Sequence, residues 1–93
     1  MKEIIINDKA YHIIENVKDA VDINEMEQKI TEYFYPFDYI VGDWAYGKLR
    51  LKGFYQENHP ECQKMNNINY VDDYIKKFCA YGCRHFIIAK IKE

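Results

Sequence analysis

The strongest constraint on the fold of this 93-residue chain is a β-hairpin predicted in its middle. Two strand-like runs, 37–44 and 48–55, flank a short connection that ends in Gly47. Glycine adopts a positive φ at little cost, as the tight turns of hairpins require. The first run is apolar on both of its faces, which predicts an interior position in the sheet. Gly42 and Gly53 lie inside the two runs, where glycine is typical of a bulge.

Further strands are predicted at both ends of the chain. Two short β-prone runs, 4–6 and 11–15, are separated by polar turn residues, so the chain is expected to open with another hairpin. An apolar run over 84–91 predicts the final strand.

Hydrophobic spacing predicts two helices. The first is expected over 22–35, with Asp22 as its N-cap and Pro36 as its stop, because proline disfavours helical geometry in the residue before it. The second is expected over 69–81, where Asn69 can cap the first turn.

The predicted element order is ββαββαβ, which indicates an α+β fold. A chain of this length rarely builds two cores, so residues 1–93 are expected to form a single domain. We expect a two-layer sandwich with a central antiparallel hairpin, in which both helices cover one face of the sheet.

Composition narrows the class of protein. The formal net charge is −2, which argues against a strongly basic nucleic-acid binder and leaves only a local basic patch for binding phosphates. No segment approaches the roughly 20 apolar residues of a membrane span, so we expect a cytoplasmic protein without a membrane partner. In that compartment the three cysteines are expected to be reduced thiols.

A regular pattern of charge marks the second strand of the central hairpin. Lys48, Arg50 and Lys52 occupy alternate positions, so their side chains are expected on one face of the strand. Leu49 and Leu51 are expected on the other face, toward the helices.

Three like charges in a row need a counter-charge nearby. Asp38 or Asp43 on the neighbouring strand can supply it by ordinary cross-strand ion pairs. An anionic ligand can supply it equally well. The residues leave both alternatives open.

Aromatic residues accompany these cations, and this combination predicts a binding surface. Single-stranded nucleic acid is bound by cations that meet phosphates and by rings that stack on bases, so RNA, single-stranded DNA or another polyanion is one class of partner. The same aromatics are typical anchors of protein interfaces, so a partner protein or a second copy of the chain is the alternative. The candidate binding residues are Asp43, Trp44, Tyr46, Lys48, Arg50, Lys52 and Phe54.

No pattern in the chain identifies a catalytic or metal site. Imidazole and thiolate are good zinc ligands, and a cysteine with a histidine base could form a nucleophile. The spacing of these residues is not specific for either, so we assign no catalytic residue, no metal ligand and no cofactor, and an enzyme is only a third class of function. The histidines and cysteines concerned are His12, His59, Cys62, Cys79, Cys83 and His85.

Several segments resemble the YutD-like family of small cytosolic proteins from Gram-positive bacteria. The matching stretches are residues 38–44, 46–47 and 49–54, and the resemblance extends over about residues 11–91. Tyr74, Cys79, Gly82 and Cys83, followed by an apolar strand, fit the C-terminal half of the family. The resemblance implies a bacterial α+β domain and no particular activity.

Two residues depart from the family pattern. Ala45 stands where the family has glycine, and Lys48 stands where it has a neutral polar residue. Arg50 and Lys52 match the pattern, so the cation at position 48 belongs to this chain rather than to the family.

Overall fold

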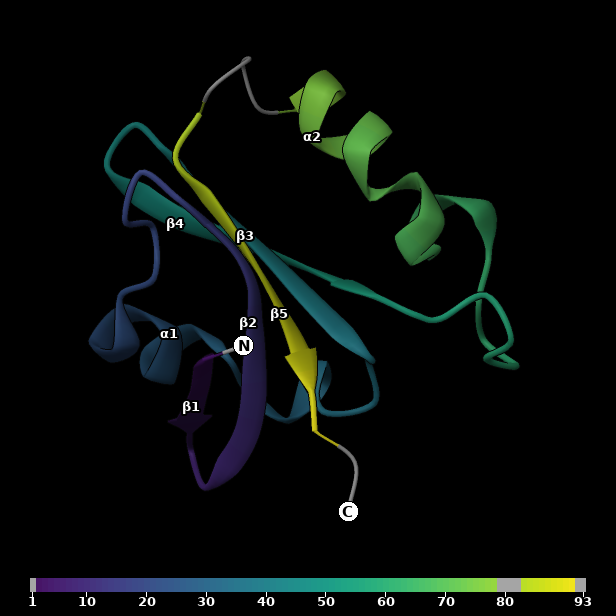
Figure 1. Cartoon of the computed structure of the whole chain (residues 1–93), viewed down its shortest axis with the longest axis horizontal. Helices are drawn as coiled ribbons and strands as arrows, with labels where there is room; N and C mark the ends of the chain where they lie inside the picture. The colour runs from purple at the N-terminus through teal and green to yellow at the C-terminus, as the bar shows by residue number, and fades with distance from the viewer. Residues whose placement is uncertain (1, 79–82, 92–93) are drawn as a thin grey trace.

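The computed structural model describes residues 2–78 and 83–91 (Figure 1). Within them, five antiparallel strands form one sheet in the spatial order β1-β2-β5-β3-β4. The strands are β1 (Lys2–Ile6), β2 (Lys9–Val17), β3 (Tyr39–Ala45), β4 (Lys48–Phe54) and β5 (His85–Lys90). The helices are α1 (Ile23–Lys29) and α2 (Val71–Phe78), with short 3₁₀ turns η1 (Glu32–Phe34), η2 (Lys64–Asn66) and η3 (Ile68–Tyr70). The predicted α+β class and ββαββαβ order are confirmed.

The central hairpin closes as its sequence predicts. Tyr46 and Gly47 have φ values of 54° and 75°, and Ala45 pairs with Lys48, so the loop has two residues with the positive φ that a type I′ turn needs. β3 lies between β5 and β4, which confirms the interior position expected from its apolar faces. β4 lies at one edge of the sheet.

The first helix is shorter than the predicted 22–35. Asp22 caps it as expected by accepting a hydrogen bond from the N–H of Glu25, but the helix ends where Ile30 takes an extended backbone. The side-chain amide of Asn7 donates to the carbonyls of Glu27 and Ile30, at 3.0 and 2.9 Å. This contact from the first hairpin satisfies the helix end, which spacing along the sequence does not reveal.

The second helix begins one residue before the predicted position 69, as the 3₁₀ turn η3, and becomes α-helical only from Val71. The carboxamide oxygen of Asn67 accepts from the N–H of Asn69 and begins η3, which continues into α2. The cap is therefore Asn67 rather than Asn69. The predicted end of this helix at residue 81 lies outside the described residues.

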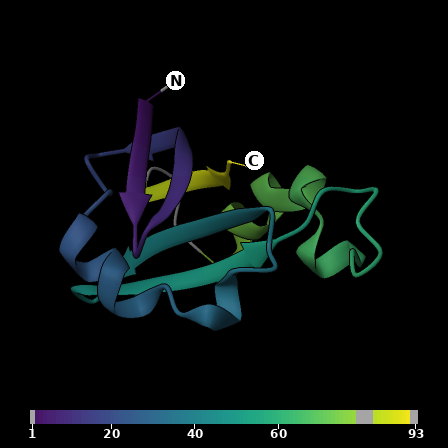
Figure 2. The same cartoon turned by 90° about the horizontal axis from the view of Figure 1, so that it is seen from below.

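The prediction that both helices cover one face of the sheet is wrong. Met26 and Ile30 pack with Ile40 on one face, whereas α2 packs on Val41 and Ile87 on the other. Figures 1 and 2 place α1 and α2 on different sides of the strands. β3 and β5 carry apolar side chains on both faces, so each face needs its own cover.

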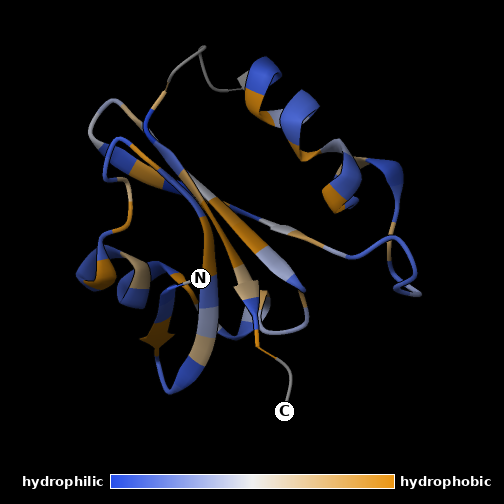
Figure 3. Cartoon of the chain, viewed as in Figure 1, coloured by the Kyte–Doolittle hydropathy of each residue, from blue (hydrophilic) through white to orange (hydrophobic). Residues whose placement is uncertain are grey.

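α2 is amphipathic in keeping with this position. Its exposed residues include Asp72, Asp73 and Lys76, and Figure 3 shows hydrophilic and hydrophobic residues alternating along its turns. Neither helix in the described part of the chain has the length and apolar composition to cross a bilayer.

Two glycines of the central hairpin make room for aromatic rings rather than for bulges. A Cβ on Gly42 would lie 2.2 Å from a ring carbon of Phe86, and one on Gly53 would lie 2.2 Å from the ring of Phe37. The β3–β4 register runs without a shift through both positions, so the predicted bulges are wrong. Close packing against a ring is the physical reason for glycine here.

Candidate functional site

The three cations of β4 lie on the sheet face that α2 covers. The β3–β4 register places Lys48, Arg50 and Lys52 opposite Ala45, Asp43 and Val41. Leu49 is buried on the opposite face, in the same cluster as Met26 of α1 and Ile30, which follows that helix. The predicted alternation of cations and leucines is therefore confirmed, but the expectation that both helices lie on the leucine face is wrong, because α2 lies on the face of the cations.

The positive charge of Arg50 is paired with a carboxylate of the protein itself. Its Nε and Nη2 donate to the two carboxylate oxygens of Asp43, at 3.1 and 2.7 Å. These bonds and the negative charge of Asp43 raise the pKa of Arg50. The Asp43 side chain is only 4% exposed, against 50% for Arg50, so the carboxylate depends on this partner. For Arg50, the alternative of an ordinary cross-strand ion pair is the one observed.

Lys52 contacts two aromatic rings. Its ammonium nitrogen lies 5.5 Å from the ring centroid of Phe54 and 5.7 Å from that of Tyr74 on α2. Cations are attracted to ring faces at such distances. Phe54 is 1% exposed, so its ring packs between β4 and α2 instead of offering an open face to a base.

Trp44 lies on the sheet face opposite the cations of β4, and Tyr46 lies at the hairpin turn. Trp44 is on the α1 face, where its indole N–H donates to the carbonyl of Ala20 at 2.8 Å and the guanidinium of Arg84 lies 4.5 Å from its ring centroid. Tyr46 is fully exposed at the hairpin turn. The predicted surface is thus divided between two faces: Asp43, Lys48, Arg50, Lys52 and Phe54 share one face, whereas Trp44 lies on the other, where it lines a hollow that Lys48 also borders.

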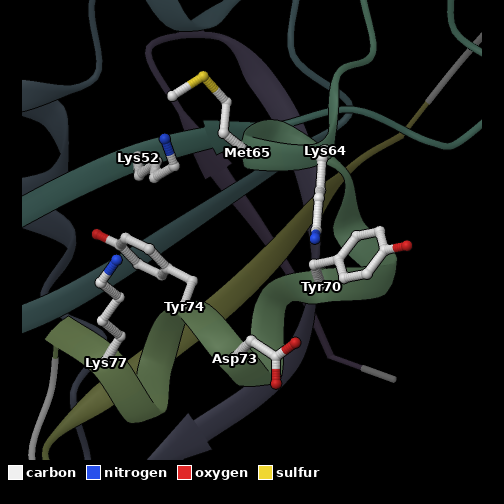
Figure 4. A pocket seen from close by; sticks show the side chains of 7 residues that line it. All are labelled: Lys52, Lys64, Met65, Tyr70, Asp73, Tyr74 and Lys77. Atoms are coloured by element: carbon white, nitrogen blue, oxygen red, sulfur yellow. The ribbon is translucent and has the colours of Figure 1, made fainter.

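A groove of about 430 Å³ opens between β4 and the segment from η2 to α2. Figure 4 shows that its side chains come from β4, η2, η3 and α2. Lys64 places its ammonium nitrogen 5.7 Å from the ring centroid of Tyr70, as Lys52 does beside Tyr74. We call it the lysine–tyrosine groove; its lining residues are Lys52, Lys64, Met65, Tyr70, Asp73, Tyr74 and Lys77.

Sequence reasoning identified only Lys52 among these lining residues. The others lie on the loop after β4 and on α2, which was expected on the opposite sheet face. Their signal is a recurrence of lysine and tyrosine over residues 64–77, which becomes a surface only when α2 lies beside β4.

Burial within this site and in the core predicts an alkaline limit to stability. The pKa of Tyr74 is raised mainly by burial and, to a smaller extent, by the negative charge of Asp43. The pKa of Tyr11 is raised mainly by burial and, to a smaller extent, by its electrostatic interaction with Tyr35. The folded protein therefore holds these phenolic protons more tightly than the unfolded chain. Their contribution to stability is complete below about pH 10, the ordinary tyrosine pKa, and is lost as the pH rises through the folded values.

Phenolate absorbance during a pH titration checks this expectation. Tyr11→Phe and Tyr74→Phe should each remove one late-titrating group and reduce the loss of stability above about pH 10. Tyr46→Phe, at the exposed turn, is the matched control for the removal of a surface hydroxyl. Equal alkaline profiles for all three variants would contradict the assignment.

Among residues 2–78 and 83–91, the candidate ligands Cys83 and His85 meet, with 3.7 Å between Sγ and Nδ1, but no third candidate joins them. No group of three His, Cys, Asp or Glu side chains there could hold a metal ion. His59 stacks on Tyr55 at 4.1 Å between ring centroids, and its Nδ1 accepts from the N–H of Glu61. His85 Nε2 lies 3.4 Å from a carboxylate oxygen of Glu15.

The cysteines differ from the expectation in one respect. Cys62 is a free thiol as predicted, but Cys83 is disulfide-bonded, so the prediction of three reduced thiols is wrong for it. An odd number of cysteines does not exclude a single bridge. Cys79 lies outside the described residues.

Comparisons with known proteins agree with the fold. Residues 5–89 match the sequence profile of the family described as "Putative antitoxin YutD-like". The Bacillus subtilis (strain 168) protein named "Putative antitoxin YutD" is 32% identical over 90 residues, which cover 97% of this chain and 99% of that protein. The solution NMR structure of protein yutD from B. subtilis matches with a TM-score of 0.80 and 31% identity, over 100% of this chain and 84% of that one. This chain therefore belongs to the YutD-like family.

Proposed function

We propose that this protein is a regulatory binding module that acts on a partner protein, and that it holds this partner at the outer edge of β4. One observation carries the proposal: β4 is an edge strand with cations on one face, and hollows with exposed apolar side chains lie beside it. Edge strands are sites where another chain can attach. The names of its relative and family support a protein target, because an antitoxin counteracts a toxin.

A second hollow of about 470 Å³ lies across the edge of β4 at residues 51–53. On one side it is lined by Tyr33, which is 70% exposed, and on the other by Met65, which is 69% exposed. Exposed aromatic and thioether side chains are adaptable anchors for a protein partner. The hollow shares Lys52, Met65 and Tyr74 with the lysine–tyrosine groove, so the two form one concave surface.

Single-stranded nucleic acid is the second candidate partner, favoured by the lysine–tyrosine groove. The lining of this groove contains three lysines, Lys52, Lys64 and Lys77, and one acidic residue, Asp73. The groove therefore presents a surplus of positive charge that phosphates could bind. The rings are less suited to bases, because lysines lie over Tyr70 and Tyr74. A partner protein fits the geometry better.

The test compares two kinds of anchor in a capture experiment from the native bacterium. We expect a protein partner, identified by mass spectrometry, to remain bound after nuclease treatment and to be lost from the Tyr33→Ala/Met65→Ala variant. Ile5→Ala is the matched control, because Ile5 is 66% exposed on the opposite edge strand and should leave capture unchanged.

The opposite outcome would favour nucleic acid. Capture that nuclease abolishes would overturn the proposal. So would binding of a uridine-rich oligonucleotide that weakens with salt at a log–log slope of about 2 and is lost from Lys64→Ala/Lys77→Ala, since single strands give about 0.7 per phosphate neutralised.

A further inference from the structure

We propose that β4 accepts an extended segment of its protein partner as a sixth strand, and that this segment alternates acidic and apolar residues. This inference rests on the proposed function and names the chemistry of the partner. It follows from three properties of β4: the direction of its backbone groups, the pattern of its side chains and the charge that discourages self-pairing.

The turn of the central hairpin sets the direction of the backbone groups. In a two-residue loop the flanking pair, here Ala45 and Lys48, is hydrogen-bonded, and bonded pairs then alternate along the ladder. The N–H and C=O groups of Leu49, Leu51 and Gly53 therefore point away from β3. Within the described part of the chain, these three residues form no backbone hydrogen bond to a segment outside the sheet. Of these three residues, Leu51 is partly exposed, whereas Leu49 is 4% exposed and Gly53 is buried, so the neighbouring side chains that cover these two must move aside before an incoming strand can bond the whole row.

The side chains of β4 then select the sequence of that strand. Residues paired directly with Lys48 and Lys52 would lie on the α2 face, next to two ammonium groups, whereas a residue paired with Leu51 would lie on the α1 face. Directly opposed residues of opposite charge stabilise a sheet, and so do apolar pairs. The segment should carry Glu or Asp two residues on either side of a central position, with apolar residues between.

The central position should be less selective. It lies opposite Arg50, whose guanidinium is already held by both carboxylate oxygens of Asp43. An acidic residue there would compete with Asp43, so a neutral residue should serve equally well. This distinction follows from the ion pair and would not arise from a uniform basic surface.

The same cations discourage a second copy of the chain. Two β4 strands paired antiparallel about Arg50 would place Lys48 of each copy opposite Lys52 of the other. Directly opposed like charges destabilise a sheet, and lysines on edge strands are a common device against self-association. Pairing between two β4 strands is therefore disfavoured, whereas pairing of β4 with an acidic strand is not.

The test uses a synthetic peptide of alternating Glu and Val with blocked termini. Adding it should slow hydrogen exchange at the amides of Leu49, Leu51 and Gly53 by about tenfold or more, while those of Lys48 and Lys52, already bonded to β3, change little. The alternation of protected and unchanged amides along one strand is the signature of strand addition.

Two matched controls separate strand addition from attraction by charge. N-methylation of the peptide at the residues whose N–H groups face β4 should abolish protection, whereas N-methylation at the intervening residues should preserve it. Lys48→Glu/Lys52→Glu should abolish it, whereas Lys2→Glu, an exposed cation of the opposite edge strand, should not.

Equal protection by both N-methylated peptides, or no change at Leu49, Leu51 and Gly53, would overturn the inference. If the partner is captured as proposed and depends on Tyr33 and Met65 while these amides do not respond to the peptide, strand addition fails and the binding module stands. If a uridine-rich oligonucleotide protects the amides instead of the peptide, both fail.

Discussion

Replacing Gly42 by alanine is expected to lower the free energy of unfolding by about 3 kcal/mol, near the upper end for overpacked cores. The new methyl group would lie 2.2 Å from the ring of Phe86, which is fully buried between the sheet and α1. Neither the strand nor the ring has room to move, since β3 is paired on both sides. Chemical denaturation of the purified variant measures the loss.

Two further variants show whether the ring is the cause. Gly53→Ala creates a similar clash with Phe37, but that ring is only partly buried and can shift, so the loss should be clearly smaller. Phe86→Leu replaces the ring by a smaller side chain. The double variant Gly42→Ala/Phe86→Leu should therefore lose less free energy of unfolding than the sum of the losses in the two single variants. A Gly42→Ala variant within about 0.5 kcal/mol of the native protein would contradict the packing described for β3.

The change Arg50→Ala is expected to cost about 2 kcal/mol, because it leaves the buried carboxylate of Asp43 without its bidentate partner. This loss is smaller than the loss expected when a fully buried ion pair is broken. The side chain of Arg50 is 50% exposed, so water can reach the carboxylate of Asp43 once the arginine side chain has been removed. Thermal or chemical unfolding near neutral pH measures it.

Lys48→Ala is the matched control for the change at Arg50. It removes a neighbouring cation of the same strand face that is exposed at the hairpin end, and it should change stability by less than about 0.5 kcal/mol. The double variant Asp43→Asn/Arg50→Ala, which removes both charges, should recover part of the loss. Equal stability of the Arg50→Ala and Lys48→Ala variants would mean that the ion pair contributes nothing.

Local patterns in the sequence predicted most of the fold. The apolar faces of residues 37–44 predicted an interior strand, and Gly47 predicted the turn. The alternation from Lys48 to Lys52 predicted that the cations and the leucines lie on different faces of the strand. Each of these inferences depends on residues a few positions apart, where side-chain direction is fixed by strand geometry.

Features that depend on distant segments could not be predicted in this way. The end of α1 is set by Asn7, and the small size of Gly42 is explained by Phe86, far along the chain. For the same reason, the composition of the candidate site was predicted only in part. Trp44 is close to the cations in sequence but bonds to Ala20 on the other face. Lys64 is distant in sequence but shares the groove with Lys52.

The spatial order of the strands also has a consequence for synthesis of the protein. β2 and β3 do not pair with each other; each pairs with β5, the last strand in chain order. A nascent chain on the ribosome can therefore form both hairpins but cannot join them until β5 has emerged. Until then, the flanks of β2 and β3 that β5 will occupy are open to proteases and to pairing with other chains. Emergence of β5 is thus the step that joins the two halves of the domain.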